Sequence, residues 1–363
     1  MRRRLLVIDG FVPRQAWGAG YPRAEALVNT AAGLGWAVSL LPLDPADTGA
    51  GAALAPGIEV LTGHGAAGLA GVLQTRRGAW DAVLVSRPET MQVLRAADAP
   101  PWPLLGGARL IYDAEALFSA RTAQRAALLG APLTHAAQAA LLVEELRLTA
   151  GVDAVIAVTP AEAAVFRAGQ TAPVHVVSHP VHPRPGPPFA ARGGFLFVGR
   201  LNEQESPNWD GLRWFIQAAW PRIRTALPDA VLDVVGGLHA DTADLQAPGV
   251  RLLGPLPQLG PAYDRARVFV APTRFAAGVP IKVLEAAAAG LPVVTTRLIA
   301  GQLGWQPGTE AAAADDPEGL AALAVRLHQD PLGWAAMQRA SQVRLAADHG
   351  ATRFRWALSG ALD

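Results

Sequence analysis

Short apolar runs alternate with longer stretches of helical period along almost the whole chain. Residues 4–9 (RLLVID), 81–86 (DAVLVS) and 108–115 (ARLIYDAE) are three of the apolar runs, and a segment with helical spacing follows each of them. This alternation is typical of parallel α/β architecture, in which a helix connects each strand to the next. We expect roughly six such units in the first half, enough for one doubly wound domain.

The pattern stops at residues 179–193 and then starts again. This stretch, HPVHPRPGPPFAARG, is dense in proline and glycine and lacks apolar periodicity, which is typical of a linker. An apolar run (GFLFVG) opens the next part, and a single amphipathic helix is predicted over residues 208–227. The sequence therefore predicts two Rossmann-like domains, residues 1–178 and 194–345, that face each other across a cleft. Helical period continues from residue 331 to the end.

Composition agrees with a folded two-domain protein and excludes several classes of function. Of 363 residues, 51% are hydrophobic and 17% charged, so the chain buries large cores. A net charge of +1 gives no bulk attraction for nucleic acid. The absence of cysteine excludes disulfides, thiolate metal sites and cysteine nucleophiles.

The N-terminus does not read as a signal peptide, because Asp9 ends its apolar run too early. No apolar run elsewhere reaches the eighteen or so residues that a membrane span requires. We expect a cytoplasmic protein. Arg2, Arg3 and Arg4 are predicted to flank the first strand, and the alternative is weak peripheral contact with anionic lipid at the inner membrane face.

Lys282 is the only lysine of the chain, although lysine and arginine together number 31. It lies in residues 268–296, which read as a strand, a loop with Arg274 and Gly278, a helix, and a second strand. Three residues further on, Glu285 offers a hydrogen-bond acceptor. The N-terminus of a helix attracts anions, so we predict an anion site here. The alternative is a lysine that survived by chance on a solvated helix face.

Polar residues also follow two strands of the first half, where open α/β sheets bind ligands. Asp113 is a candidate general base or acceptor for a substrate hydroxyl, and a helix N-cap is the alternative. Glu115 lies two residues further on, but no histidine or third carboxylate is near enough in sequence to predict a metal site. Arg87 follows the strand at 81–86 and is predicted to reach into the cleft.

The segment GAGYPR contains Gly18, Gly20 and Arg23 and resembles a dinucleotide fingerprint only in part. Arg23 occupies the third glycine position, and eight residues separate the end of the strand from Gly18. The fingerprint needs its glycines in the turn itself, which argues against NAD. We predict a close-approach surface for an acceptor or a phosphate, and a simple flexible loop is the alternative.

Similar signals mark the second half. Arg200 stands at the end of one strand, and Gly236 and Gly237 end another and permit close approach of a flat ligand such as a base. Asn208 and Asp210 suit the start of the helix that follows. Together with the segment around Lys282, these residues indicate a nucleotide pocket.

Residues 194–215, 250–296 and 298–305 resemble the C-terminal domain of the group-one, family-four-like glycosyltransferases with the GT-B fold. The first half is similar more loosely, through VIDGFVP, GAGYPRAEALV and YDAEALFSAR. The resemblance implies transfer of a sugar from a nucleoside-diphosphate donor with retention of anomeric configuration, without a metal or other cofactor. It also implies that residues 346–363 form a helix that crosses back onto the N-terminal domain.

Positions that match the family's motifs receive roles from this resemblance. Glu285 corresponds to the glutamate that holds the donor ribose, Gly278 and Val279 to the backbone that meets the diphosphate, and Arg200 to the arginine that neutralises it. Gly237 and Leu253 are expected near the base. The acceptor side is expected to include Gly18, Gly20, Arg23, Arg87 and Glu115.

Two positions depart from the family pattern. Ala277 stands where a first glutamate is expected, and Glu205 stands near the place of a lysine. A leaving diphosphate carries about two negative charges and needs cations nearby. We therefore predict that Arg274 and Lys282 replace the missing lysine, and that Arg200, Lys282 and Asp113 are the catalytic residues.

The predicted activity is transfer to a glycan, lipid-linked or small-molecule acceptor, as in bacterial polysaccharide biosynthesis. A nucleotide-sugar epimerase or a phosphorylase would keep the fold. The alternative from another class is a non-catalytic binding or scaffold protein on a degenerate glycosyltransferase fold, which Ala277 and Glu205 favour.

Overall fold

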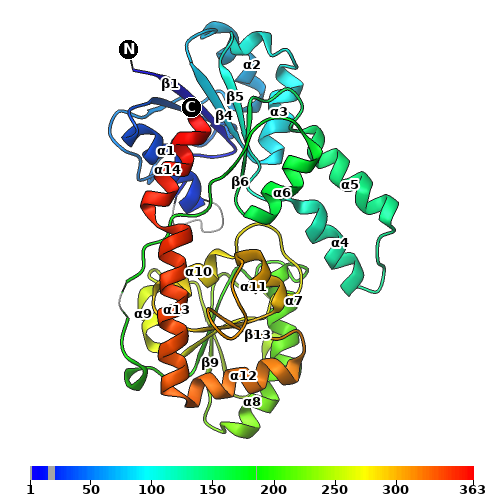
Figure 1. The fold of residues 1–363 in the computed structure, drawn as a ribbon, viewed down its shortest axis with the longest axis vertical. Coiled ribbons are helices and arrows are strands. Elements are labelled where there is room, and N and C mark those ends of the chain that lie inside the picture. The colour runs from blue at the N-terminus through cyan, green and yellow to red at the C-terminus, as the bar shows by residue number, and fades with distance from the viewer. Residues whose placement is uncertain (1, 15–20, 185) are drawn as a thin grey trace.

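The computed structural model describes residues 2–14, 21–184 and 186–363. Two α/β domains lie one above the other along the long axis, each built on a parallel sheet with helices on both faces (Figure 1). The predicted fold class is confirmed. Strands of this kind are buried on both faces, which is why they appear in the sequence as unbroken apolar runs.

The N-terminal sheet has seven strands in the order β3-β2-β1-β4-β5-β6-β7. The order reverses between β1 and β4, and a ligand crevice is expected at the carboxyl ends of the strands beside such a reversal. The strands are β1 (Arg4–Asp9), β2 (Ala37–Pro42), β3 (Glu59–Val60), β4 (Ala82–Ser86), β5 (Arg109–Asp113), β6 (Ala154–Ala157) and β7 (Val174–Val176).

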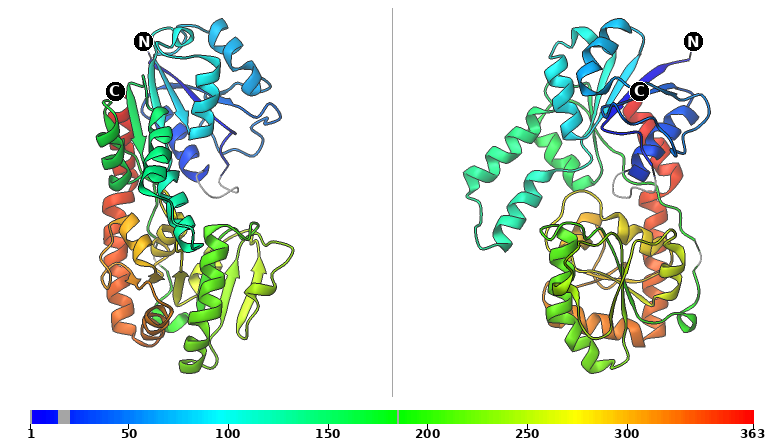
Figure 2. Two further views of the ribbon diagram at one scale, coloured as in Figure 1. Left: turned by 90° about the vertical axis from the view of Figure 1, so that its right-hand side faces the viewer. Right: turned by 180° about the vertical axis from the view of Figure 1, so that it is seen from behind.

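Six helices belong to the described part of the N-terminal domain: α1 (Tyr21–Gly33), α2 (Gly65–Thr75), α3 (Pro88–Ala97), α4 (Phe118–Leu128), α5 (His135–Arg147) and α6 (Pro160–Gly169). The helical structure predicted after residue 115 is present as two helices, α4 and α5, rather than as one continuous run. Gly130 adopts φ 75°, which ends α4, and the Thr134 hydroxyl caps α5 by accepting from the backbone N–H of Ala137. The resulting hairpin projects away from the N-terminal sheet (Figures 1 and 2).

The C-terminal sheet has six strands in the order β10-β9-β8-β11-β12-β13. They are β8 (Phe195–Val198), β9 (Leu232–Val235), β10 (Val250–Gly254), β11 (Val268–Ala271), β12 (Val293–Thr295) and β13 (Ala312–Ala313). Here the order reverses between β8 and β11, so the segment that carries Lys282 follows a strand beside the reversal.

The helices of this domain are α7 (Pro207–Trp214), α8 (Trp220–Ala226), α9 (Gly260–Arg265), α10 (Ile281–Ala288), α11 (Arg297–Leu303) and α12 (Pro317–Gln329). The single helix predicted over residues 208–227 is interrupted by a π-helical segment, Phe215–Ala219. Pro221 accounts for the interruption, because it lacks an N–H and its ring would clash with the carbonyl of Gln217 in a regular α-helix.

Two C-terminal helices connect the domains. The first, α13 (Pro331–His349), buries Trp334 and Met337 along the C-terminal domain. The second, α14 (Ala351–Leu362), places Phe354 and Leu358 in the apolar cluster formed with β1 and α1. The predicted crossing back onto the N-terminal domain is therefore confirmed, and Figure 1 shows it at the red end of the chain.

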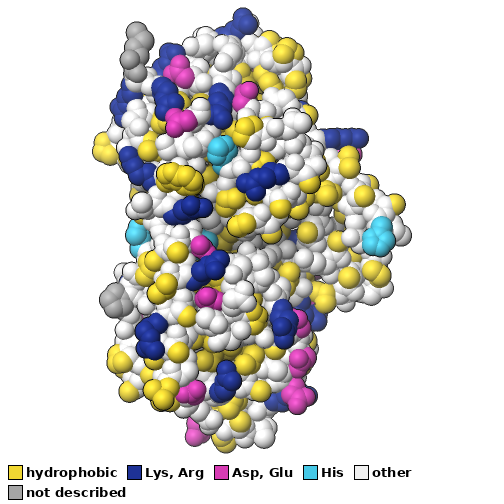
Figure 3. Space-filling model, in the orientation of Figure 1, with side chains coloured by type: hydrophobic (Ala, Val, Ile, Leu, Met, Phe, Trp, Pro, Cys, Tyr) yellow, Lys and Arg dark blue, Asp and Glu magenta, His cyan; other side chains and the backbone are white. Residues whose placement is uncertain are grey.

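The arginines at the N-terminus are engaged within the molecule. Arg3 forms an ion pair with Asp363 at 2.6 Å, and Arg4 forms one with Asp81 at 3.5 Å. Arg3 directly precedes β1 and Arg4 is its first residue, so both lie at the start of the first strand, close to the predicted place. Lysine and arginine side chains are spread over both domains on the face shown in Figure 3. In the described ranges, no helix has both the length and the apolar character needed to cross a membrane.

Candidate functional site

The loop between β11 and α10 lies against the N-terminal domain. The backbone N–H of Gly278 donates to Glu162 Oε1 of α6 at 3.1 Å, and that of Ala276 donates to Gln124 Oε1 of α4 at 3.0 Å. Gly278 has φ 72°, and a Cβ there would stand 3.3 Å from the Cβ of Ala116. The loop that carries Gly278 and Val279 thus meets the chain that follows β5, and the two domains approach each other at this point.

Lys282 lies in the first turn of α10 and has no anionic partner among the described residues. Its Nζ donates to Asn208 Oδ1 at 2.6 Å and lies 4.8 Å from the centre of the Phe197 ring. Burial lowers its pKa to about 7, since neither neighbour carries a charge that would offset the loss of hydration. An anion placed beside Lys282 would favour the charged ammonium.

Arg274, unlike Lys282, has an anionic partner. Its guanidinium makes two hydrogen bonds to Asp210, at 2.9 and 2.6 Å, and lies 5.1 Å from the centre of the Trp214 ring. Bidentate pairs of this kind are among the stronger polar contacts in proteins. Its predicted contact with a diphosphate stays a prediction, and this pairing argues against it because Asp210 already neutralises the charge.

Glu285 accepts a hydrogen bond from the Tyr263 hydroxyl at 3.0 Å. Burial raises the pKa of the Glu285 carboxyl and of the Tyr263 hydroxyl. Tyr263 was not predicted from the sequence, since nothing in the pattern of α9 shows that this side chain faces α10. If Glu285 binds the donor ribose as predicted, its carboxylate would accept hydrogen bonds from both the ribose and the Tyr263 hydroxyl.

The other predicted donor residues lie at the carboxyl ends of the first strands of this sheet. Arg200 follows β8, and its exposed side chain has no hydrogen-bond or ion-pair partner among the described residues. Gly237 follows β9, where an added Cβ would lie 2.5 Å from Asn202 Oδ1, so a larger residue would require the Asn202 side chain to shift. Leu253 lies in β10 with 37% of its surface exposed. Their roles toward a base and diphosphate stay predictions.

A cavity of about 150 Å³ lies beside Lys282. Thr273, Ala276, Ala277 and Asn208 line it from the C-terminal domain, and Arg121 of α4 lines it from the N-terminal domain. Ala277 is the position where the family pattern has a glutamate, so the small side chain leaves part of this space open. Arg121 was not among the site residues predicted from the sequence, although it is the last residue of the segment YDAEALFSAR.

A second polar cluster marks the carboxyl ends of β1, β4 and β5. Arg87 adopts φ 79° and lies 3.0 Å from Glu115 and 3.7 Å from Asp9. Its guanidinium also lies 4.5 Å from the centre of the Tyr21 ring. Burial raises the pKa of Asp9 to about 7, although Arg87 opposes the shift. Arg87 and Glu115 were predicted on the acceptor side, and the structure brings them together with Asp9.

Asp113 and Arg23 form a buried ion pair with each other, whereas the sequence predicted that both would meet the acceptor. The guanidinium donates to the two carboxylate oxygens at 2.7 and 2.9 Å, and also to the carbonyl of Val177. Neither side chain is exposed. An acceptor would find no accessible oxygen on Asp113, so this geometry favours a structural role over that of a general base, and it leaves Arg23 without an acceptor-facing surface.

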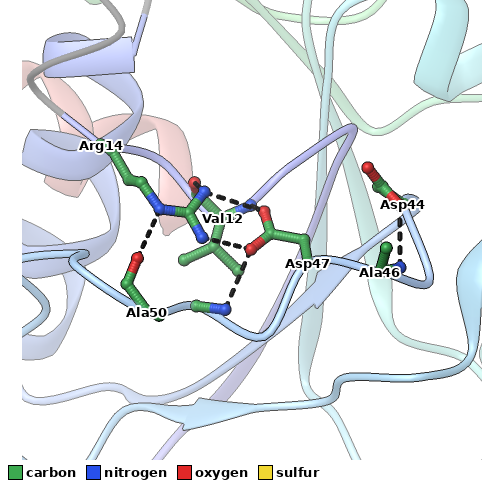
Figure 4. A network of polar contacts seen from close by, with 7 residues as sticks. Val12, Arg14, Asp44, Ala46, Asp47 and Ala50 are labelled. Carbon is green, nitrogen blue, oxygen red and sulfur yellow. Dashed lines mark hydrogen bonds and ion pairs between the residues drawn. The ribbon is translucent and has the colours of Figure 1, made fainter.

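Gly18 and Gly20 lie outside the described residues. The chain just before them is held by Asp47, whose carboxylate accepts from the backbone N–H groups of Val12 and Gly49 and pairs with Arg14 (Figure 4). Asp47 follows β2 and Val12 follows β1, so this network ties together the loops at the carboxyl ends of two neighbouring strands.

Glu205, near the place of the expected lysine, forms an ion pair with Arg125 of α4. The departure from the family pattern therefore creates a contact between the domains. Within the described ranges, no group of three or more histidine or acidic side chains could hold a metal ion. Metal-independent chemistry stays a prediction.

Comparison with solved structures identifies the class of fold. The chain is similar to sucrose-phosphate synthase from Thermosynechococcus elongatus, with a TM-score of 0.72 and 16% identity over 99% of this chain and 98% of that one. Anabaena HepE in complex with UDP and glucose gives 0.69 and 15%, over 99% of both chains. An α,α-trehalose-phosphate synthase (UDP-forming) from Burkholderia xenovorans gives 0.68 and 14%, over 99% and 100%. The fold is that of the GT-B glycosyltransferases.

The sequence of the second domain matches a known family model. Residues 192–330 match the family described as Glycosyl transferases group 1. A search among curated proteins finds no significant match. The resemblance predicted for the second half is therefore confirmed over residues 192–330, where the chain matches a group 1 glycosyltransferase domain.

Proposed function

We propose that the protein transfers a sugar from a nucleoside-diphosphate donor on the C-terminal domain to an acceptor hydroxyl on the N-terminal domain, with retention of configuration. The observation that carries this proposal is the position of Lys282, without an anionic partner, beside an interdomain cavity in a group 1 domain. HepE has been crystallised with UDP-glucose, which supports a UDP-linked donor as the first candidate.

In the proposed reaction the oxygen of the acceptor hydroxyl bonds to the anomeric carbon, and its proton passes to a phosphate oxygen of the leaving diphosphate. The bond from that carbon to the donor phosphate breaks, and the nucleoside diphosphate leaves with the electron pair. Arg200 and Lys282 would stabilise the charge that develops on the leaving group, an effect that is large when the cations are already in place. Glu285 would orient the ribose.

The acceptor is proposed to bind near Arg87, Glu115 and Asp9 at the carboxyl ends of the N-terminal strands. This cluster offers both a cation and hydrogen-bond acceptors beside the point where the strand order reverses. A glycan, a lipid-linked sugar and a small molecule each present hydroxyl groups to such a cluster. We also propose a cytoplasmic location, with peripheral membrane contact if the acceptor is lipid-linked.

Calorimetry with UDP, GDP, ADP and dTDP tests the donor site, and turnover of the matching sugar nucleotides tests the activity. We expect one nucleoside diphosphate to bind and its sugar conjugate to be hydrolysed slowly, or transferred when an acceptor is present. Proton NMR of the first product reports its anomeric configuration. Binding of no nucleotide would contradict the donor site, and an inverted product would contradict retention.

A further inference from the structure

Helix α4 contributes a cation to the cavity from the opposite domain. The helix belongs to the N-terminal domain, yet Arg121 lines the same cavity as Lys282 of the C-terminal domain. The two side chains come from positions 161 residues apart, so neither the spacing nor the pattern of the sequence indicates that they share a cavity. Figure 2 shows the α4–α5 hairpin reaching along the C-terminal domain.

The charges around this cavity are unbalanced. None of the residues that line it is an aspartate or a glutamate, and its other side chains are small, apolar or neutral. Among the described residues, Lys282 bonds only to the neutral amide of Asn208, and it also contacts the Phe197 ring. Arg121 has no hydrogen-bond or ion-pair partner in the described part of the chain. Two cations beside one small cavity repel each other unless an anion lies between them.

Other contacts of α4 hold Arg121 in this place. Gln124 accepts the N–H of Ala276, and Arg125 pairs with Glu205. Residues 121, 124 and 125 are three and four apart, so they lie on one face of the helix. No residue of α4 is buried, which means that this face, rather than an apolar core, positions the helix against the C-terminal domain.

We propose that Arg121 and Lys282 together bind the diphosphate of the donor, so that each domain supplies one cation to the leaving group. This inference rests on the proposed function and deepens it. Arg121 takes the place of the lysine that is replaced by Glu205, and Glu205 itself docks the helix that carries Arg121. The anion site is complete only while α4 is docked, so donor binding favours the closed arrangement of the domains.

Inorganic pyrophosphate and UDP, titrated into the full-length protein by calorimetry, test the inference. We expect Arg121→Gln and Lys282→Met each to weaken binding of pyrophosphate and of UDP by about tenfold, since each removes a charge-assisted contact worth roughly 1.5 kcal/mol or more. Uridine, which has no phosphate, should bind all variants alike. Arg121→Lys should restore part of the affinity.

Arg147→Gln is the matched control, because it removes one positive charge from the neighbouring helix α5, where Arg147 pairs with Glu144 on the surface. It should bind pyrophosphate and UDP like the wild type, and melting curves should show all variants folded. Wild-type affinity in Arg121→Gln would overturn the inference while leaving the proposed function standing. Pyrophosphate binding that depends on Arg121, without binding of any nucleoside diphosphate, would support the anion site and overturn the proposed function. A wild-type protein that binds neither would overturn both.

Discussion

At the scale of single residues, environment rather than identity sets the chemistry. Lys282 is conspicuous in the sequence because it is the only lysine, but its half-buried place between Asn208 and Phe197 is what lowers its pKa. Asp113 shows the opposite case. Its position at a strand end suggests catalysis, yet the guanidinium of Arg23, from a helix ninety residues earlier, occupies both of its oxygens.

The pKa of Lys282 predicts how donor binding varies with pH. Because burial lowers this pKa to about 7, the ammonium is charged below pH 7 and loses its proton as the pH rises. In calorimetric titrations we expect the affinity for UDP to fall as the pH rises from 6.5 to 9, by at most about tenfold per pH unit. The range begins above the second pKa of a phosphate, which is near 6, so that the charge of UDP itself changes little. Lys282→Arg stays charged in this range and should lose the dependence. The same profile in both proteins would contradict the assignment.

The buried pair of Arg23 and Asp113 predicts a large effect on stability. Arg23→Met leaves a buried carboxylate without its partner, and we expect the free energy of unfolding to fall by about 3–5 kcal/mol in denaturant titrations. Arg76→Met is the control, since Arg76 pairs with Glu59 at 2.9 Å on the surface. It should cost less than about 1 kcal/mol. Equal losses of unfolding free energy in the two variants would show that the buried pair contributes no more to stability than the exposed pair does.

At the scale of elements, the site depends on contacts between a loop and a helix from different domains. The β11–α10 loop has two of its N–H groups bound by side chains of α4 and α6. The sequence predicted the loop from its position between strand and helix, and it predicted helical structure after residue 115. The sequence did not predict that the loop and α4 would contact each other. Contacts through amides and surface charges do not alter the spacing of apolar residues, which is the signal that predicts the elements.

Gly278→Ala tests this docking. Its φ of 72° strains any residue with a Cβ, and the added methyl group would press on Ala116. We expect a loss of about 1–2 kcal/mol in stability and a lower rate of donor turnover. Gly301→Ala is the control, because it lies in α11 with nothing within 4 Å of the added Cβ. A helical glycine replaced by alanine should keep or raise stability. Unchanged turnover in Gly278→Ala would argue against a role for the close contact.

At the scale of the whole molecule, the C-terminal helices connect the two domains. Leu358 of α14 is fully buried in the N-terminal core, whereas Trp356 on the same helix is 68% exposed. We expect Leu358→Ala to lower the free energy of unfolding of the N-terminal domain by about 2–5 kcal/mol. Thermal or denaturant unfolding would measure this loss. Trp356→Ala should change it by no more than about 0.5 kcal/mol. If both variants unfolded alike, the packing of α14 would not contribute as proposed.

The sequence by itself determined the two parallel α/β domains, the family of the second and the candidate donor segment, because these depend on local periodicity and on motifs contiguous along the chain. The tertiary structure alone decided which charges are free. It paired Arg274 with Asp210, buried Asp113 with Arg23, and left Lys282 beside a cavity that Arg121 reaches from the other domain. The reason is physical: the energy of a charge depends on its distance to every other charge and to water, and folding alone determines those distances.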